Sequence, residues 1–116
     1  MPRMAFRRLI EAEACPPGRG TFVAVEGFKL AVFHLTDPPR FAVIDDLCPH
    51  AGGDLSSGEL TGTVVACPWH HWEFDVTTGR CPNGRTADVA CYPVEVRDGA
   101  VYADLDNPMW QLPELT

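Results

Sequence analysis

Two short motifs, each pairing a cysteine with a histidine, constrain this chain more than any other feature of its sequence. The first reads Cys48-Pro49-His50, and the second runs from Cys67 to His70, with sixteen residues between the two motifs. Thiolate sulfur and imidazole nitrogen are both ligands of transition metals. Two loops that each supply one sulfur and one nitrogen predict a four-ligand metal site. The chain must therefore fold so that two separate loops meet at one point.

This donor set fits two kinds of metal site. In a Rieske-type [2Fe-2S] cluster, two cysteines hold one iron and two histidines hold the other. A structural zinc ion also accepts two cysteines and two histidines. Zinc modules usually keep like ligands together, whereas each motif here mixes the two types. The pattern favours the [2Fe-2S] cluster and leaves a zinc-stapled binding module as the alternative.

The residues around both motifs resemble the Rieske ferredoxin family. The first run is CPHAGG over residues 48–53, and the second is CPWHHWEFD over residues 67–75. The resemblance implies one [2Fe-2S] cluster per chain, with two cysteines on the inner iron and two histidines on the outer iron. The implied ligands are Cys48, Cys67, His50 and His70.

The rest of the sequence is typical of an all-β domain. Eleven prolines and ten glycines in 116 residues predict frequent turns. Runs rich in β-branched, aromatic or alternating apolar residues predict seven or eight short strands and no convincing helix. These runs are residues 6–10, 21–25, 28–35, 41–44, 63–66, 71–76, 92–97 and 100–105. They predict an antiparallel β-sandwich or partly open barrel.

The resemblance adds an arrangement to this fold. It implies a single Rieske [2Fe-2S] domain over residues 1–116, with the ligand loops at one end as a small cluster-binding subdomain. The two loops are residues 46–54 and 66–72.

Two strand segments carry specific predictions about side chains. In the segment after His70, alternation predicts that Trp72, Phe74 and Val76 face the core. The last two strands predict a hairpin around Asp98-Gly99, with one apolar face. The predicted opposite pairs are Val96 with Val101, Val94 with Ala103 and Tyr92 with Leu105.

Several other reactive residues are more typical of structure than of chemistry. Asp45-Asp46 precede the first motif, and we expect them to cap the loop or lie at the surface. His34 lies inside a predicted strand, where a lone histidine is usually structural. The remaining cysteines, Cys15, Cys81 and Cys91, are expected to be partly buried thiols outside any disulfide.

Charge and hydropathy exclude some partners. Nine basic and sixteen acidic residues give a net charge of −7, which argues against binding nucleic acid. An acidic surface can instead steer a protein toward a basic patch on a redox partner. The N-terminus lacks the apolar segment of a secretion signal, and no apolar run is long enough to span a membrane. These features predict a cytoplasmic protein with no membrane partner.

This sequence differs from one branch of the family at positions that affect the reduction potential of the cluster. Rieske proteins of the cytochrome bc type carry a bracing disulfide whose positions are Gly53 and Trp69 here. Those proteins also have serine and tyrosine hydroxyls where this chain has Trp72 and Phe74. The resemblance therefore implies a potential toward the low end of the Rieske range. His71 replaces a glycine that is usual in the family.

The sequence thus predicts an electron-transfer component of an oxidoreductase system, with no substrate site of its own. The resemblance implies a carrier that passes one electron from a flavin reductase to a terminal oxygenase. One alternative is the small subunit of an NADH-dependent nitrite reductase, suggested by residues 67–79. The other is the zinc-stapled binding module.

Overall fold

The computed structural model describes residues 6–48, 53–68, 72–82 and 89–108. Within these ranges the regular structure is almost entirely β, as the sequence predicts. The strands are β1 (Phe6–Glu11), β2 (Gly20–Val25), β3 (Phe28–Leu35), β4 (Arg40–Asp45), β5 (Glu59–Thr61), β6 (Val64–Ala66), β7 (Glu73–Asp75), β8 (Cys91–Tyr92), β9 (Val94–Arg97) and β10 (Ala100–Asp104). Two 3₁₀ helices, η1 (Ala12–Ala14) and η2 (Leu55–Ser57), were not expected. Neither of these two has the length or hydropathy to span a membrane.

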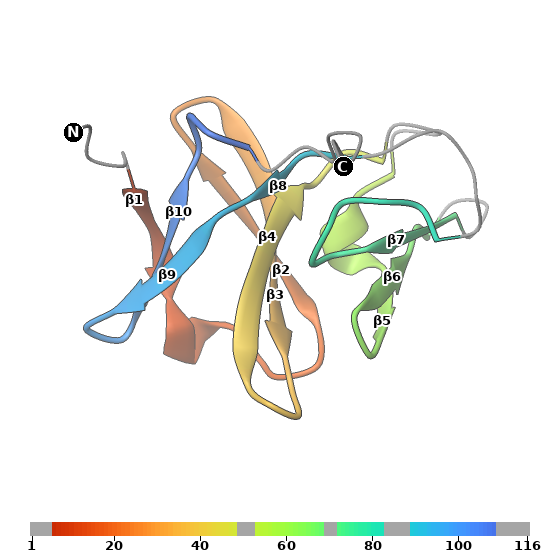
Figure 1. Ribbon diagram of the computed structural model, residues 1–116, viewed down its shortest axis with the longest axis horizontal. Coiled ribbons are helices and arrows are strands. Elements are labelled where there is room, and N and C mark those ends of the chain that lie inside the picture. Colours follow the sequence, from red (N-terminus) through yellow and green to blue (C-terminus); the bar gives the residue numbers. More distant parts are fainter. Residues whose placement is uncertain (1–5, 49–52, 69–71, 83–88, 109–116) are drawn as a thin grey trace, which may run out of the picture.

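The strands form three antiparallel sheets. Two larger sheets have the orders β1-β10-β9 and β2-β3-β4-β8, and a small sheet has the order β5-β6-β7. Figure 1 shows the small sheet at one end of the molecule and β1, β9 and β10 at the other. This arrangement confirms the predicted all-β fold with a small separate subdomain.

Strand β3 is buried on both faces and separates two hydrophobic cores. Its Leu30 and Val32 pack into the core toward the β1-β10-β9 sheet. Its Ala31 and Phe33 pack into a second core, which we call the cysteine core because it contains four of the five cysteines. A strand covered on both sides needs apolar residues at successive positions, which explains the unbroken apolar run at its centre.

Two tight turns follow the local sequence signals. Glu26 and Gly27 both have positive φ, at 51° and 87°, and connect β2 to β3. Asp98 and Gly99 do the same between β9 and β10, at 51° and 79°. Positive φ at both central residues gives a turn whose twist matches the hairpin. The predicted pairs Val96 with Val101 and Val94 with Ala103 are confirmed.

One predicted pairing is wrong. Tyr92 does not lie opposite Leu105 but belongs to β8, where it pairs with Val43 of β4. Proline ends the ladder because it has no N–H to donate. Pro93 therefore marks the point where the chain leaves one sheet for the other, and its carbonyl accepts a hydrogen bond from the Asp104 N–H at 3.0 Å.

The number of strands is also higher than the seven or eight expected. The described residues contain ten, because the single run 92–97 divides into β8 and β9 and because β5 gave no signal. β5 has only three residues with one apolar side chain, Leu60, so it is too short for an alternating pattern to be recognised. Pairing with β6 holds it in the sheet.

Candidate metal centre

The first ligand loop is closed by backbone contacts at its base. Leaving β4, the chain reaches Cys48, whose N–H donates to the Gly53 carbonyl at 2.9 Å. Just outside this bond, Leu47 and Asp54 form an isolated antiparallel bridge. These contacts place the Cys48 thiol at the start of a closed loop. The predicted ligand His50 lies outside the described residues.

The second ligand loop connects β6 to β7 and is closed in the same way. The Cys67 N–H donates to the Trp72 carbonyl at 2.6 Å. Below this bond, the β6–β7 ladder begins with Ala66 opposite Glu73. In both loops the cysteine N–H thus bonds the carbonyl five residues later. The predicted ligand His70 lies outside the described residues.

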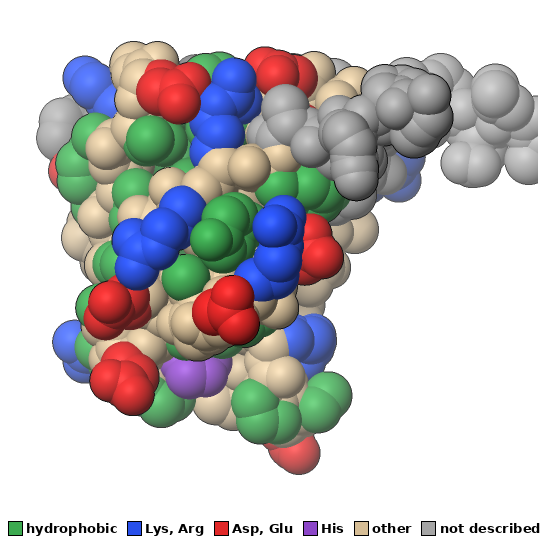
Figure 2. Space-filling view, turned by 90° about the vertical axis from the view of Figure 1, so that its left-hand side faces the viewer, with side chains coloured by type: hydrophobic (Ala, Val, Ile, Leu, Met, Phe, Trp, Pro, Cys, Tyr) green, Lys and Arg blue, Asp and Glu red, His purple; other side chains and the backbone are tan. Residues whose placement is uncertain are grey.

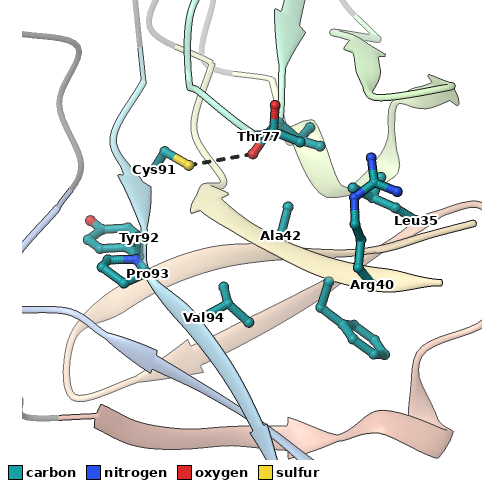
Figure 3. Close-up of a pocket in the computed structure, with 10 residues that line it drawn as sticks. Leu35, Arg40, Ala42, Thr77, Cys91, Tyr92, Pro93 and Val94 are labelled. Carbon is teal, nitrogen blue, oxygen red and sulfur yellow. Dashed lines mark hydrogen bonds between the residues drawn. The ribbon is translucent and has the colours of Figure 1, made fainter. Parts of the chain in front are cut away.

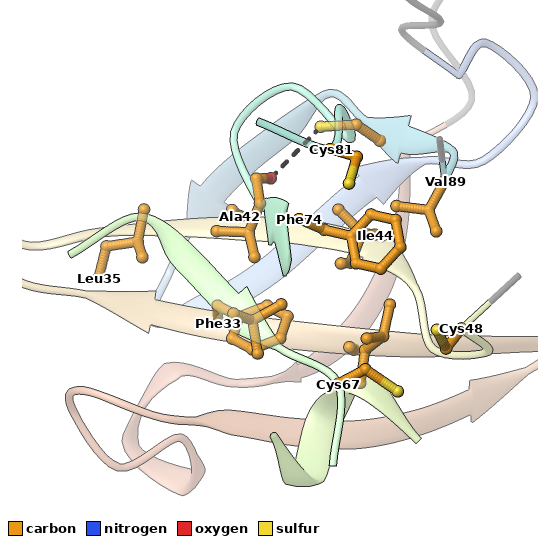
Figure 4. Close-up of a cluster of buried hydrophobic side chains, with 14 residues drawn as sticks. Phe33, Leu35, Ala42, Ile44, Cys48, Cys67, Phe74, Cys81 and Val89 are labelled. Atoms are coloured by element: carbon orange, nitrogen blue, oxygen red, sulfur yellow. Dashed lines mark hydrogen bonds between the residues drawn. The ribbon is translucent and has the colours of Figure 1, made fainter. Parts of the chain in front are cut away.

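The two predicted ligand cysteines lie in one core. Cys48 is 1% exposed and Cys67 is 0% exposed, and neither forms a disulfide. Both belong to the cysteine core, and Figure 4 shows them together at one end of it. Thiolates from two separate loops, sheltered from water, are the donor set that one iron of a [2Fe-2S] cluster requires. The described residues therefore fit the cysteine half of such a cluster.

The side chains after the second loop point as predicted. Phe74 and Val76 are completely buried in the cysteine core, and Trp72 packs against it while partly exposed. The two positions that carry hydroxyls in cytochrome bc-type relatives therefore present apolar groups at this centre.

Asp46 braces the first ligand loop. Its Oδ1 accepts a hydrogen bond from the Ser56 N–H at 2.7 Å. Its carbonyl accepts from the Leu55 N–H at 2.7 Å, and its N–H donates to the Lys29 carbonyl at 3.0 Å. Asp46 therefore joins the loop to β3 and to η2, which confirms the expected loop-capping role.

Asp45 makes a contact that sequence reasoning missed. The Tyr92 hydroxyl donates to Asp45 Oδ1 at 2.7 Å. Burial raises the pKa of the Asp45 carboxyl, and the hydrogen bond from Tyr92 acts against this rise. Burial and then the bond to Asp45 raise the pKa of Tyr92. The partners are 47 residues apart, so no local pattern could have paired them.

His34 is structural, as expected. Its Nδ1 lies 2.8 Å from the Cys15 carbonyl oxygen, which can only accept, so Nδ1 carries the proton. Its ring stacks on Phe41 with centroids 4.4 Å apart. These contacts hold the loop before β2 against β3.

The cysteines outside the two motifs are all buried, and none forms a disulfide. The Cys91 thiol donates to the Val76 carbonyl at 3.5 Å. Burial, followed by the charge of Asp75, raises the pKa of Cys91 to about 11. A thiol with this pKa is almost fully protonated near neutral pH and is a poor nucleophile.

An apolar groove of about 400 Å³ lies away from the ligand cysteines. It opens where the chain passes from β8 into β9 and leaves the edge of β4, and Figure 3 shows Arg40 and Thr77 at its edge. Its floor includes Ala42, Cys91 and Val94. The groove contains neither Cys48 nor Cys67, so it is a different place from the metal centre.

Comparison with known proteins shows which class of protein has this fold and sequence. The ferredoxin component of the naphthalene 1,2-dioxygenase system of Pseudomonas aeruginosa is 35% identical over 91 residues, covering 78% of this chain and 86% of that protein. The ferredoxin bound to its oxygenase in carbazole 1,9a-dioxygenase is 32% identical with a TM-score of 0.76, covering 88% and 94% of the two chains. These relatives define a small electron-transfer protein, a ferredoxin.

Two further matches support less, because one has low sequence identity and the other covers only part of a longer protein. The small subunit of a nitrite reductase has a TM-score of 0.75, with 85% of this chain and 97% of that chain covered. At 23% identity this likeness shows the fold alone. Cholesterol 7-desaturase of Xenopus laevis is 28% identical over 92% of this chain, which spans 26% of that longer protein.

The family follows from a match over most of the chain. The model of the Rieske [2Fe-2S] domain matches residues 6–93. The chain belongs to the Rieske [2Fe-2S] domain family. Its cofactor is a [2Fe-2S] cluster and its function is electron transfer, so the zinc-stapled binding module is set aside.

Proposed function

We propose that this chain carries electrons from a flavin reductase to a terminal oxygenase. The main support for this proposal is that two buried thiols, Cys48 and Cys67, lie in one core although they come from separately closed loops. The ferredoxin relatives of oxygenase systems support the oxygenase as acceptor. The nitrite reductase role has weaker support, because its likeness rests on the fold.

We assign four residues as cluster ligands. They are Cys48, His50, Cys67 and His70. When bound, a [2Fe-2S] cluster takes up and releases one electron at a time. The two cysteines hold one iron from the buried side, where the cysteine core excludes water. The two histidines hold the other iron.

The surface near the loops supports a basic redox partner. Between residues 53 and 82, the described part of the chain has four exposed or half-buried carboxylates and one arginine, Arg80; the carboxylates are Asp54, Glu59, Glu73 and Asp75. Leu47, immediately before Cys48, is 59% exposed. An exposed apolar side chain on an acidic part of the surface favours a partner surface with an apolar centre and a basic rim.

We also infer that the protein acts in the cytoplasm. None of its five cysteines forms a disulfide, although all are present in the described part of the chain. Five cysteines without a disulfide are typical of a protein from a reducing compartment.

Absorption and electron paramagnetic resonance (EPR) spectra test the ligand assignment. We expect a brown protein whose dithionite-reduced form shows the low average g-value of a cluster with two histidine ligands. Cys48→Ser and His70→Ala should each abolish this spectrum. Cys15→Ser, which changes a buried cysteine outside both loops, should leave it unchanged. A colourless protein that contains zinc would contradict the proposal.

A further inference from the structure

Asp46 is a buried charged residue close to the cluster ligands. It is 3% exposed and precedes Cys48 by two positions. None of the ion pairs in the described part of the chain includes it. Burying a carboxylate without a cation is costly, because its charge loses the solvation of water.

The bracing role of Asp46 does not require that charge. Within the described part of the chain, the hydrogen bond that its side chain accepts runs from the Ser56 N–H to Oδ1 at 2.7 Å. The amide oxygen of an asparagine could accept the same hydrogen bond at lower desolvation cost. The negative charge therefore needs a second explanation.

The position of Asp46 supplies one. The residue that it caps, Ser56, follows Leu55, and Leu55 belongs to the same buried core as Cys48 and Cys67. A charge inside the protein acts through a lower effective dielectric than one at the surface. A negative charge next to an electron-accepting centre makes an added electron less favourable, which lowers the reduction potential.

We propose that Asp46 is a positioning residue with a second, electrostatic role. Its hydrogen bonds fix the start of the first ligand loop, and its buried charge lowers the reduction potential of the cluster. The inference rests on the [2Fe-2S] cluster and is independent of which reductase or oxygenase is the partner.

Three variants separate the two roles. Asp46→Asn keeps the acceptor and removes the charge, whereas Asp46→Ala removes both. Asp54→Asn is the matched control, because Asp54 is exposed, lies at the end of the same loop and makes no side-chain cap to η2. Redox titration of each cluster-loaded protein gives the reduction potential. Thermal unfolding gives the stability of each variant. The EPR spectrum shows whether the ligand loops still hold the cluster in the same way.

We expect a higher potential for Asp46→Asn, with unchanged g-values. Asp54→Asn should shift the potential much less, because water and salt screen an exposed charge. Asp46→Ala should also lower the unfolding temperature and the amount of cluster retained. Asp46→Ser, a smaller neutral acceptor, is a second variant if Asp46→Asn does not hold a cluster.

Two results would overturn the proposal. One is a cluster-loaded neutral variant whose potential is no higher than that of Asp54→Asn. The other is loss of the cluster from both Asp46→Asn and Asp46→Ser while Asp54→Asn retains it. In that case the charge of Asp46 would be needed for the cluster to be bound at all. A wild-type protein without a [2Fe-2S] spectrum would contradict the ligand assignment instead.

Discussion

Asp45 and Asp46 are neighbours in the sequence but belong to different sides of the sheet. Successive side chains along a strand point to opposite faces. Asp45 therefore meets Tyr92, which packs in the core toward the β1-β10-β9 sheet. Asp46 meets Ser56 of η2. Two identical residues thus perform different tasks, and neither contact forms an acid–base pair.

Asp45 should make stability depend on pH. Its folded pKa is raised above the ordinary value of 3.8, so the folded state binds the proton more tightly than the unfolded state. Its contribution to stability is therefore largest below that value and falls as pH rises through the raised pKa. Asp45→Asn removes the charge and keeps an acceptor for Tyr92. We expect this variant to be more stable than wild type near neutral pH, with a gain that shrinks toward pH about 4.

Denaturant unfolding of the two proteins across this pH range measures the difference. Asp54→Asn removes an exposed carboxylate and should show no comparable gain near neutral pH. A gain for Asp45→Asn that grows as pH falls would contradict the assigned cause.

At the level of elements, Gly79 joins the small sheet to the segment before β8. Its N–H donates to the Asp75 carbonyl at 2.7 Å, and its own carbonyl accepts from the Val89 N–H at 2.9 Å. Gly79 has a φ of +81°, and a Cβ built there would collide with the Val89 carbonyl oxygen. Only glycine meets both conditions.

Gly79→Ala should destabilise the protein more than a positive φ alone explains. Gly62→Ala is the matched control, because Gly62 has a φ of +63° and nothing within 4 Å of the added Cβ. We expect the control to lose about 1–2 kcal/mol of unfolding free energy from backbone strain. Gly79→Ala should lose clearly more, because the Val89 backbone must also move. Equal losses in denaturant unfolding would show that the collision is relieved.

The elements that could be predicted are those whose sequence pattern lies within a few consecutive residues. Glu26-Gly27 and Asp98-Gly99 identify their hairpins because the turn chemistry lies within the turn itself. The candidate ligands Cys48 and Cys67 stand out in the sequence for the same reason, since each motif is short. β5 and β8 have three and two residues, and they exist through pairing with distant strands. The sharing of one core by Cys48 and Cys67 also depends on packing that no short motif encodes.

Across the whole molecule, charge is unevenly distributed. The cluster end carries an excess of carboxylates among its described residues, as noted above. Figure 2 shows arginines among acidic residues on the opposite end, where β1 carries Arg7 and Arg8 and β9 carries Arg97. Such an asymmetry would orient the molecule before contact, turning its cluster end toward a partner with a basic surface.

Leu47 should contribute to docking with a redox partner. We expect Leu47→Ser to lower the second-order rate of electron transfer to a terminal oxygenase several-fold, because an exposed apolar contact is lost. The reduction potential and EPR spectrum should stay unchanged. Val96→Ser is the matched control, since Val96 is 49% exposed on β9 at the far end. Stopped-flow mixing measures both rates, and equal slowing would exclude a docking role for Leu47.

The shared burial of Cys48 and Cys67 has a consequence for folding. Bonds from both thiolates to one iron would tie together two points of the chain that are nineteen positions apart. Such a tie restricts the unfolded chain as a covalent cross-link does, in a protein whose five cysteines form no disulfide. The cluster would thus link the loop after β4 to the small sheet, so its loss would abolish electron transfer and destabilise the fold together.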